Sequence, residues 1–308
     1  MANNNQYRFV LVTRKTRLQE LVERFNTWPQ AKFYLEHSQA DVQDYLSEHD
    51  LYQRRLLEAE QTLKTMGRLQ LLERSFLPNY QFRTADIIVV IGQDGLVANT
   101  LKYLDGQPLI AINPDPQRWD GKLLPFEIGD IKSLVSRTIA NRVESTCITF
   151  AEAKTNDGQR LLAVNDLFIG PKSHTSARYS LSWGGATEVQ SSSGIIVSTG
   201  FGSTGWFQSI LAGAMGVTGS SSHCLKNGFS WGDERLQFAV REPFPSQTTS
   251  TNLVFGAIDK DMPLSIESLM PENGVIFSDG IEADYLPFNA GTVISVSIAK
   301  TKGRLIIA

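Results

Sequence analysis

The sequence has few cysteines, no long apolar run and no excess of positive charge. Its 308 residues include two cysteines, Cys147 and Cys224, and neither belongs to a CxxC pair. A zinc site or a disulfide framework is therefore not expected. Lys and Arg total 29 against 32 Asp and Glu, a formal net charge of −3. This balance lacks the basic footprint of a nucleic-acid-binding protein and gives little attraction to an anionic membrane.

Signals for targeting and for membrane insertion are also missing. The longest apolar runs, such as Ile210–Val217, fall well short of the roughly 18 residues needed to cross a bilayer. The first apolar stretch, Tyr7–Thr13, is short and is followed at once by Arg14 and Lys15, unlike a secretory signal. We expect a cytoplasmic protein with reduced thiols.

Several common catalytic motifs do not occur. The sequence contains no Walker A motif, no HExxH, no HRD and no GxSxG. The four histidines show no metal-ligand spacing, so no metal ligand is predicted from the protein. His174 lies in a polar stretch with Lys172 and Arg178 and could contact phosphate, but an ordinary surface histidine explains it as well.

The first half of the chain alternates strand and helix patterns. Asp86–Ile91 is apolar on both faces, as a central parallel strand must be when helices cover both sides of a sheet. A long helix is predicted over Asp41–Met66, with a capping box from Ser38 to Asp41 and a left-handed Gly67 at its end. Packing of one helix face on a core explains this helix more simply than a partner surface does. The pattern predicts a doubly wound α/β domain over residues 1–130.

The second half of the chain has a different secondary-structure pattern. After Asn141, short β-rich runs follow one another between Gly and Ser residues, and only Trp206–Met215 has a helical pattern. One of these runs, Leu161–Ile169, is interrupted by the polar pair Asn165-Asp166. We expect an all-β domain, a sandwich with one helix, over residues 131–284.

Three segments could carry chemistry, and each has a simpler structural explanation. Gly92-Gln93-Asp94-Gly95 lies between a strand and a helix, where open α/β sheets bind ligands; it could bind phosphate, or form a turn in which Asp94 caps the helix. Asn165-Asp166 could contact a ligand or form an Asx turn. In Thr199–Trp206, the glycines match G-x-G-x-x-G, but no acidic residue lies about 20 positions on, so a polar nucleotide loop is favoured over a Rossmann fingerprint.

Together and in this order, the three segments resemble those of the NAD kinase family, most closely its mitochondrial-type branch. That family has GGDG between a strand and a helix, then an Asn-Glu pair, then a Gly/Ser/Thr loop before a helix. Further similarity lies in Thr13-Arg14-Lys15-Thr16, Asn113-Pro114-Asp115-Pro116 and Ser191-Ser192-Ser193-Gly194. The resemblance extends over nearly the whole chain and implies an α/β domain, a β-rich domain and a C-terminal tail, residues 285–308, that returns to the first.

The resemblance also implies an activity: transfer of the γ-phosphoryl group of ATP to the 2′-hydroxyl of the adenosine ribose of NAD or NADH, with Mg²⁺. Asp94 would be the catalytic residue. The residues implied in nucleotide binding are Gly92, Gln93, Gly95, Asn165, Asp166, Ser193, Thr199, Gly202, Ser203, Thr204, Gly205, Trp206 and Ser209. A homodimer or larger homo-oligomer is implied as well.

The sequence departs from the family pattern at a few positions. Gln93 replaces the second glycine of GGDG, Leu96 stands where threonine is usual, and Asp166 replaces glutamate. These departures leave two alternatives open. One is a non-catalytic nucleotide sensor on the same fold, and the other is a kinase of a sugar or lipid acceptor.

Overall fold

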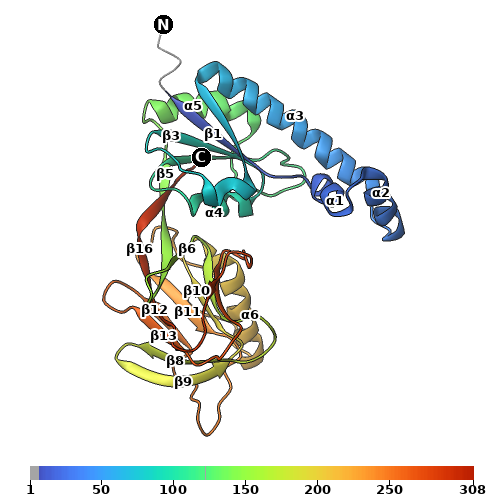
Figure 1. Ribbon diagram of the computed structural model, residues 1–308. Coiled ribbons are helices and arrows are strands. Elements are labelled where there is room, and N and C mark those ends of the chain that lie inside the picture. The colour runs from blue at the N-terminus through green and yellow to red at the C-terminus, as the bar shows by residue number, and fades with distance from the viewer. Residues whose placement is uncertain (1–6, 122) are drawn as a thin grey trace. The chain divides into compact units, whose positions relative to one another are not determined.

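The computed structural model describes residues 7–121 and 123–308 (Figure 1). Residues 1–6, part of the N-terminal segment in which no secretory signal is expected, and Lys122 lie outside the described residues. Contacts divide the chain into two units. Unit 1 extends to Thr146 and includes Arg304–Ala308, and unit 2 is Cys147–Gly303. The predicted combination of an α/β part with a β-rich part is confirmed.

Unit 1 contains a parallel sheet. Its strands lie in the order β2 (Arg68–Glu73), β1 (Arg8–Thr13), β3 (Asp86–Ile91) and β4 (Pro108–Ile112). The end of β16 (Val293–Ile306) pairs with β4, also in parallel, at Arg304 and Leu305. All six residues of β3 are buried, as predicted for a central strand.

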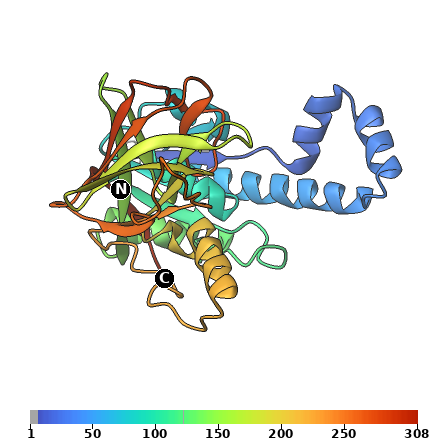
Figure 2. The ribbon, with the colours of Figure 1, turned by 90° about the horizontal axis from the view of Figure 1, so that it is seen from below.

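Unit 1 also contains helices, some of which pack on this sheet. They are α1 (Arg17–Phe25), α2 (Trp28–His37), α3 (Val42–Met66), α4 (Asp94–Leu101) and α5 (Ile131–Ile139), with 3₁₀ turns η1 (Arg74–Asn79) and η2 (Ile128–Asp130). Leu63 of α3 and Leu134 of α5 pack with Leu11 and Val89 in one apolar core. Figure 2 shows α3 extending past the sheet, with α1 and α2 at its far end.

The ends of α3 differ from the prediction. Asp41 is itself the N-cap, and its carboxylate accepts the N–H of Gln43 at 2.8 Å. The predicted capping box is wrong because Ser38 ends α2, where its hydroxyl donates to Leu35 O at 3.1 Å. Gly67 has a φ of 174°, which is extended and not left-handed. Gly67 joins α3 directly to β2 (Arg68–Glu73) with this extended backbone.

Unit 2 is built from two antiparallel sheets packed face to face. One joins β16, β13 (Leu264–Ser268), β8 (Ala177–Trp183) and β9 (Ala186–Ser192), with β5 (Ser145–Thr155) and β6 (Arg160–Ala163) beside β16. The other has the order β12 (Phe255–Ile258), β11 (Leu236–Val240), β10 (Ile195–Ser198), β7 (Asp166–Pro171), β14 (Gly274–Ser278) and β15 (Leu286–Pro287). Tyr179, Leu181, Ile169 and Phe238 belong to the core between the sheets. Strands β5 and β16 have residues in both units.

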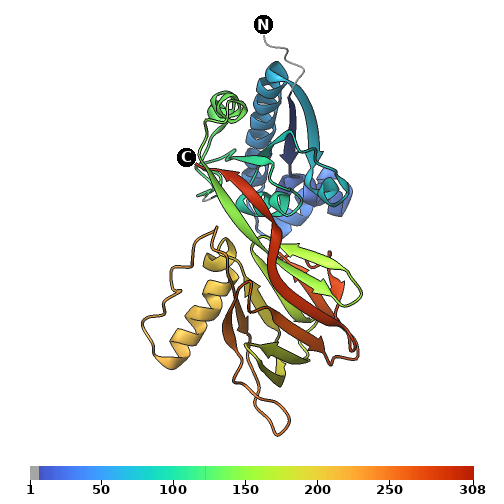
Figure 3. The ribbon, with the colours of Figure 1, turned by 90° about the vertical axis from the view of Figure 1, so that its left-hand side faces the viewer.

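The outer face of the second sheet carries the only long helix of unit 2 in the described chain. This helix, α6, spans Trp206–Thr218, slightly beyond the predicted Trp206–Met215. Ile210 of α6 packs against Phe168 and Ile196, and Figure 3 shows α6 on one side of the sheet. Across the two described ranges, none of the helices combines the length and the apolar composition needed to cross a bilayer.

Candidate functional site

Asp94 lies at the start of α4, directly after the end of β3. Its Oδ1 accepts the backbone N–H of Leu123 at 3.0 Å, and Leu123 belongs to the loop after β4. The N-cap of α4 is Gln93, which makes no side-chain capping bond. The explanation of Asp94 as a simple helix cap is therefore wrong. Its carboxylate joins the loops at the carboxyl ends of two adjacent parallel strands, where α/β sheets bind ligands.

The first turn of α4 is open at Gly95. A Cβ placed on Gly95 would meet no atom within 4 Å, and the residue is exposed. The first N–H groups of a helix have no partner within the helix and point toward its N-terminus. Such a turn can approach a phosphate group closely.

Gly92 and Leu96 serve the packing of the loop itself. A Cβ on Gly92 would lie 2.8 Å from Leu96 Cδ2, and Leu96 is buried. The Leu96 side chain is therefore turned toward Gly92 and makes an interior contact of the loop.

A cation lies next to this loop. The guanidinium of Arg14, which follows β1, donates to Glu48 Oε1 at 2.8 Å and lies 5.3 Å from the Tyr52 ring centroid. An added Cβ on Gly92 would be 3.6 Å from Arg14 Cδ. Tyr52 donates its O–H to Ile91 O at 3.1 Å and accepts the Arg14 N–H at 3.1 Å. Burial raises the pKa of Tyr52 to about 12, so this hydroxyl remains a donor at neutral pH.

In unit 2, Val164 and Asn165 form the bend between β6 and β7, and Asp166 is the first residue of β7. The backbone N–H groups of Val164 and Asn165 donate to Asp279 Oδ1 at 3.0 and 2.6 Å. The Asn165 side chain makes no hydrogen bond within the described residues, so the Asx-turn explanation is wrong. The bend is held by Asp279, and the Asn165 amide is left without a partner in the described part of the chain.

Asp166 is a buried carboxyl group. It is 7% exposed, and no described residue hydrogen-bonds to its side chain. Burial and the nearby Asp279 carboxylate raise the pKa of Asp166 to about 7. Across the sheet, Asp166 is in register with Ser198, which is in register with Gln237, whose buried Oε1 lacks a partner in the described chain. One end of the outer face is therefore polar.

The loop between β10 and α6 packs directly on the Asn165 bend. A Cβ on Gly202 would lie 2.1 Å from Asn165 O, and the Thr199 N–H donates to the same oxygen at 3.0 Å. Ser203 is fully buried, donates to Gly200 O at 2.7 Å and accepts the Phe229 N–H at 3.0 Å. Gly202 and Ser203 therefore serve the packing of the chain itself. A Rossmann fingerprint is excluded here, because β10 is antiparallel to both of its neighbours.

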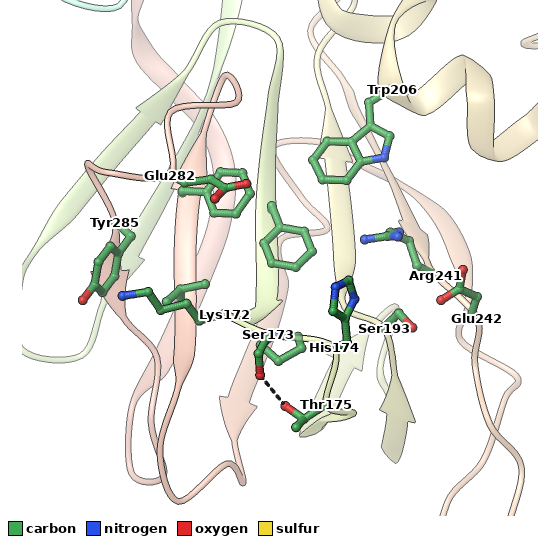
Figure 4. Close-up of a pocket in the computed structure, with 14 residues that line it drawn as sticks. Lys172, Ser173, His174, Thr175, Ser193, Trp206, Arg241, Glu242, Glu282 and Tyr285 are labelled. Carbon is green, nitrogen blue, oxygen red and sulfur yellow. Dashed lines mark hydrogen bonds between the residues drawn. The ribbon is translucent and has the colours of Figure 1, made fainter. Parts of the chain in front are cut away.

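Trp206 and Ser193 line a cavity of about 610 Å³ on the outer face of this sheet (Figure 4). The Phe168 and Trp206 rings are stacked, with centroids 5.8 Å apart and planes 9° from parallel. Added Cβ atoms on Gly170 and Gly194 would lie 2.7 and 2.8 Å from atoms of the Phe168 ring. These two glycines therefore let the ring lie flat on the sheet and form an aromatic wall.

Charged groups surround the aromatic wall, as Figure 4 shows. Arg241 lies over the Trp206 ring at 5.4 Å, and Lys172 Nζ lies over the Tyr285 ring at 4.7 Å. Glu242 and Glu282 also line the cavity. Aromatic faces with a few charged groups are suited to a planar, polar ligand.

The remaining predicted residues lie at the surface near this cavity. Thr204, Gly205 and Ser209 are exposed around the start of α6, and Ser209 Oγ donates to Trp206 O at 2.7 Å. Sequence reasoning missed Asp279, Phe168 and Arg241. Asp279-Gly280 directly after an apolar run is a turn signal that could have drawn attention to Asp279.

No metal-binding cluster is found among the described residues: no group of three or more His, Cys, Asp or Glu side chains could hold an ion. Mg²⁺ in kinases is commonly held by one or two carboxylates, water and the phosphates of the nucleotide. The Asp94 carboxylate fits the role of one such Mg²⁺ ligand.

Comparison with known proteins identifies structures that share this fold. No protein-family model matches this sequence. A search of curated proteins also found no significant match. Among solved structures, yeast NADH kinase complexed with NADH is similar, with a TM-score of 0.58 and 14% identity over 99% of this chain and 84% of the other. An NAD kinase from Archaeoglobus fulgidus in complex with ATP has a TM-score of 0.56 and 14% identity, over 97% of this chain and 93% of the other. This chain shares its fold with both kinases.

Proposed function

We propose that the protein is an ATP-dependent kinase that phosphorylates the 2′-hydroxyl of the adenosine ribose of NAD or NADH to give NADP or NADPH. The observation that carries the proposal is the Asp94 carboxylate, held through Oδ1 by the Leu123 N–H just beyond the end of β3. The fold shared with an NADH kinase and an NAD kinase supports it.

In this reaction the 2′-oxygen of the ribose attacks the γ-phosphorus of ATP. The bond between that phosphorus and the β,γ-bridging oxygen breaks, ADP leaves, and the hydroxyl proton passes to the Asp94 carboxylate. The Leu123 N–H orients this carboxylate through one oxygen. A positioned general base is typically worth about 10²- to 10⁴-fold in rate.

Each unit, taken by itself, carries groups that suit part of a nucleotide. The open first turn of α4 at Gly95 and the adjacent Arg14 suit phosphate oxygens. Mg²⁺, bound with ATP, would neutralise charge on the transferring group. In unit 2, the unpaired Asn165 amide and the buried Asp166 carboxyl suit hydrogen bonds to the dinucleotide, and Trp206 suits stacking.

The test is product formation by the purified chain. Incubation with ATP, Mg²⁺ and either NAD or NADH should give NADP or NADPH, detected by mass spectrometry. Asp94→Asn should abolish the product while its circular dichroism and melting temperature match those of the wild type. Product formation undiminished in Asp94→Asn would remove Asp94 from the mechanism.

A second candidate is a non-catalytic nucleotide sensor. Gln93 favours it, because this half-buried side chain stands at the helix start in place of glycine. Calorimetric binding of NAD or NADP, with no turnover of any triphosphate or polyphosphate, would support the sensor. Products formed from sugars or lipids in place of NAD would identify a different acceptor.

The cytoplasmic location and the homo-oligomeric state remain predictions from the sequence. The oligomeric state can be measured by light scattering coupled to gel filtration.

A further inference from the structure

One carboxylate, that of Asp279, accepts the backbone N–H groups of three successive residues. Its Oδ1 lies 3.0 Å from Val164 N, 2.6 Å from Asn165 N and 3.4 Å from Asp166 N. Resting on the function proposed above, we propose that Asp279 is a positioning residue that holds the bend at Asn165 and the adjoining Asp166 in their dinucleotide-binding conformation.

The turn that carries Asp279 is built for this contact. Asp279 follows β14, which pairs with β7 so that Ser278 faces Leu167. It has a φ of +56°, in the left-handed region that Asp, Asn and Gly tolerate best. Its own N–H donates to Asp166 O at 3.0 Å. Asp279 therefore holds the start of β7 by hydrogen bonds from its backbone N–H and to its side-chain carboxylate.

The bend is held from its other side by Thr199. The Thr199 hydroxyl donates to Val164 O, and its N–H donates to Asn165 O at 3.0 Å. The N–H groups of Val164 and Asn165 thus point to Asp279, and their carbonyl oxygens accept hydrogen bonds from Thr199. With the backbone occupied on both sides, the Asn165 amide keeps its own hydrogen-bonding groups for a ligand.

The conformation of the bend depends on the single side chain of Asp279. Hydrogen bonds from backbone N–H groups to a carboxylate are stronger than those to a neutral acceptor. Without the carboxylate, three N–H groups of the bend lose their partner, and the segment can rotate away from its ligand-binding geometry. We expect binding of the dinucleotide to weaken, because the loop after β3, which is assigned to ATP, does not contain this bend.

The test uses two substitutions at Asp279 and one control. Asp279→Gly tolerates the positive φ and removes the carboxylate, and Asp279→Asn keeps an Oδ1 acceptor without the charge. Glu188→Gln is the matched control, since Glu188 accepts the N–H groups of Asn252 and Leu253 at 3.1 and 2.8 Å in another loop of unit 2. For each folded variant, KM for NAD, KM for ATP and kcat are measured. Amide hydrogen exchange at Val164–Asp166 is followed without substrate.

Asp279→Gly should raise KM for NAD by about tenfold and leave KM for ATP within about twofold. The reason is that losing the hydrogen bonds to one charged carboxylate typically lowers affinity by about tenfold. Exchange at Val164–Asp166 should accelerate in the same variant. Asp279→Asn should raise KM for NAD by only about two- to threefold, and it provides the decisive comparison if the glycine variant does not fold. Glu188→Gln should leave both KM values unchanged.

The outcomes separate this inference from the proposed function. If the wild type is active, two results for folded Asp279→Gly overturn the positioning role alone. One is an unchanged KM for NAD, and the other is an equal rise of KM for NAD and KM for ATP. If Asp279→Gly does not fold, an unchanged KM for NAD in Asp279→Asn overturns it. Wild type that forms no NADP overturns the proposed function and this inference together.

Discussion

Asp94 Oδ1 accepts the backbone N–H of Leu123 at 3.0 Å, which joins the loop after β3 to the loop after β4. A carboxylate placed in this way has two separable tasks, one structural and one chemical. Substitutions that keep or remove the acceptor distinguish them.

Asp94→Asn should retain the stability of the wild type, whereas Asp94→Ala should lose about 1 kcal/mol, because only the asparagine keeps an acceptor for the Leu123 N–H. Urea unfolding of the two variants measures this difference. Both should lose phosphoryl transfer, since neither carries a carboxylate. An alanine variant as stable as the asparagine variant would show that the hydrogen bond from the Leu123 N–H does not contribute to the free energy of unfolding.

Two glycines should respond oppositely to alanine. Gly95→Ala should preserve or raise stability by up to about 1 kcal/mol, because alanine favours helix and the added methyl meets no atom. Gly202→Ala should cost more than about 2 kcal/mol, because its Cβ would lie 2.1 Å from Asn165 O.

Thermal and urea unfolding of both variants test this contrast. If phosphate approaches Gly95, the stable Gly95→Ala protein should still show a raised KM for ATP. An unchanged KM would place the phosphates elsewhere.

Trp206→Ala should weaken dinucleotide binding by about tenfold, the value expected for loss of one aromatic stack. Trp206→Phe is the control, because it keeps a ring that can stack on Phe168. Calorimetric titration with NAD and NADH measures both affinities. Equal affinity in the alanine and phenylalanine variants would argue against stacking at this position.

The buried Asp166 should make stability depend on pH. Its folded-state pKa is raised to about 7 by burial and by Asp279, against about 3.9 in the unfolded chain. The native state therefore binds this proton more tightly, so stability is full below about pH 4 and falls as the pH rises toward 7. The total change is a few kcal/mol, up to about 4.

Asp166→Asn should flatten this dependence in urea unfolding between about pH 4 and 7. Asp157→Asn is the control, because the Thr155 hydroxyl lowers the pKa of Asp157 and its contribution is lost only as the pH falls below that window. An unchanged slope in Asp166→Asn would show that another group titrates there.

The sequence predicted β3, α6 and the polar bend at Asn165 because each depends on local patterns. Two-sided apolarity identifies a central strand, helical spacing identifies α6, and a polar pair interrupts an apolar run. The ends of α3 were predicted less well. Ser38 was assigned to the wrong helix, since the sequence pattern did not reveal α2 before it.

By itself, the sequence determined that an α/β part is followed by a β-rich part, and where the Asp94 loop and the Asn165 bend occur along the chain. These properties follow from side-chain periodicity and turn residues within short windows. Only the tertiary structure decided that Asp279, 113 residues from Asp166, holds the bend, and that Gly202 is required by Asn165 O. Contacts of this kind depend on strand order and register, which bring distant residues together and which no local pattern encodes.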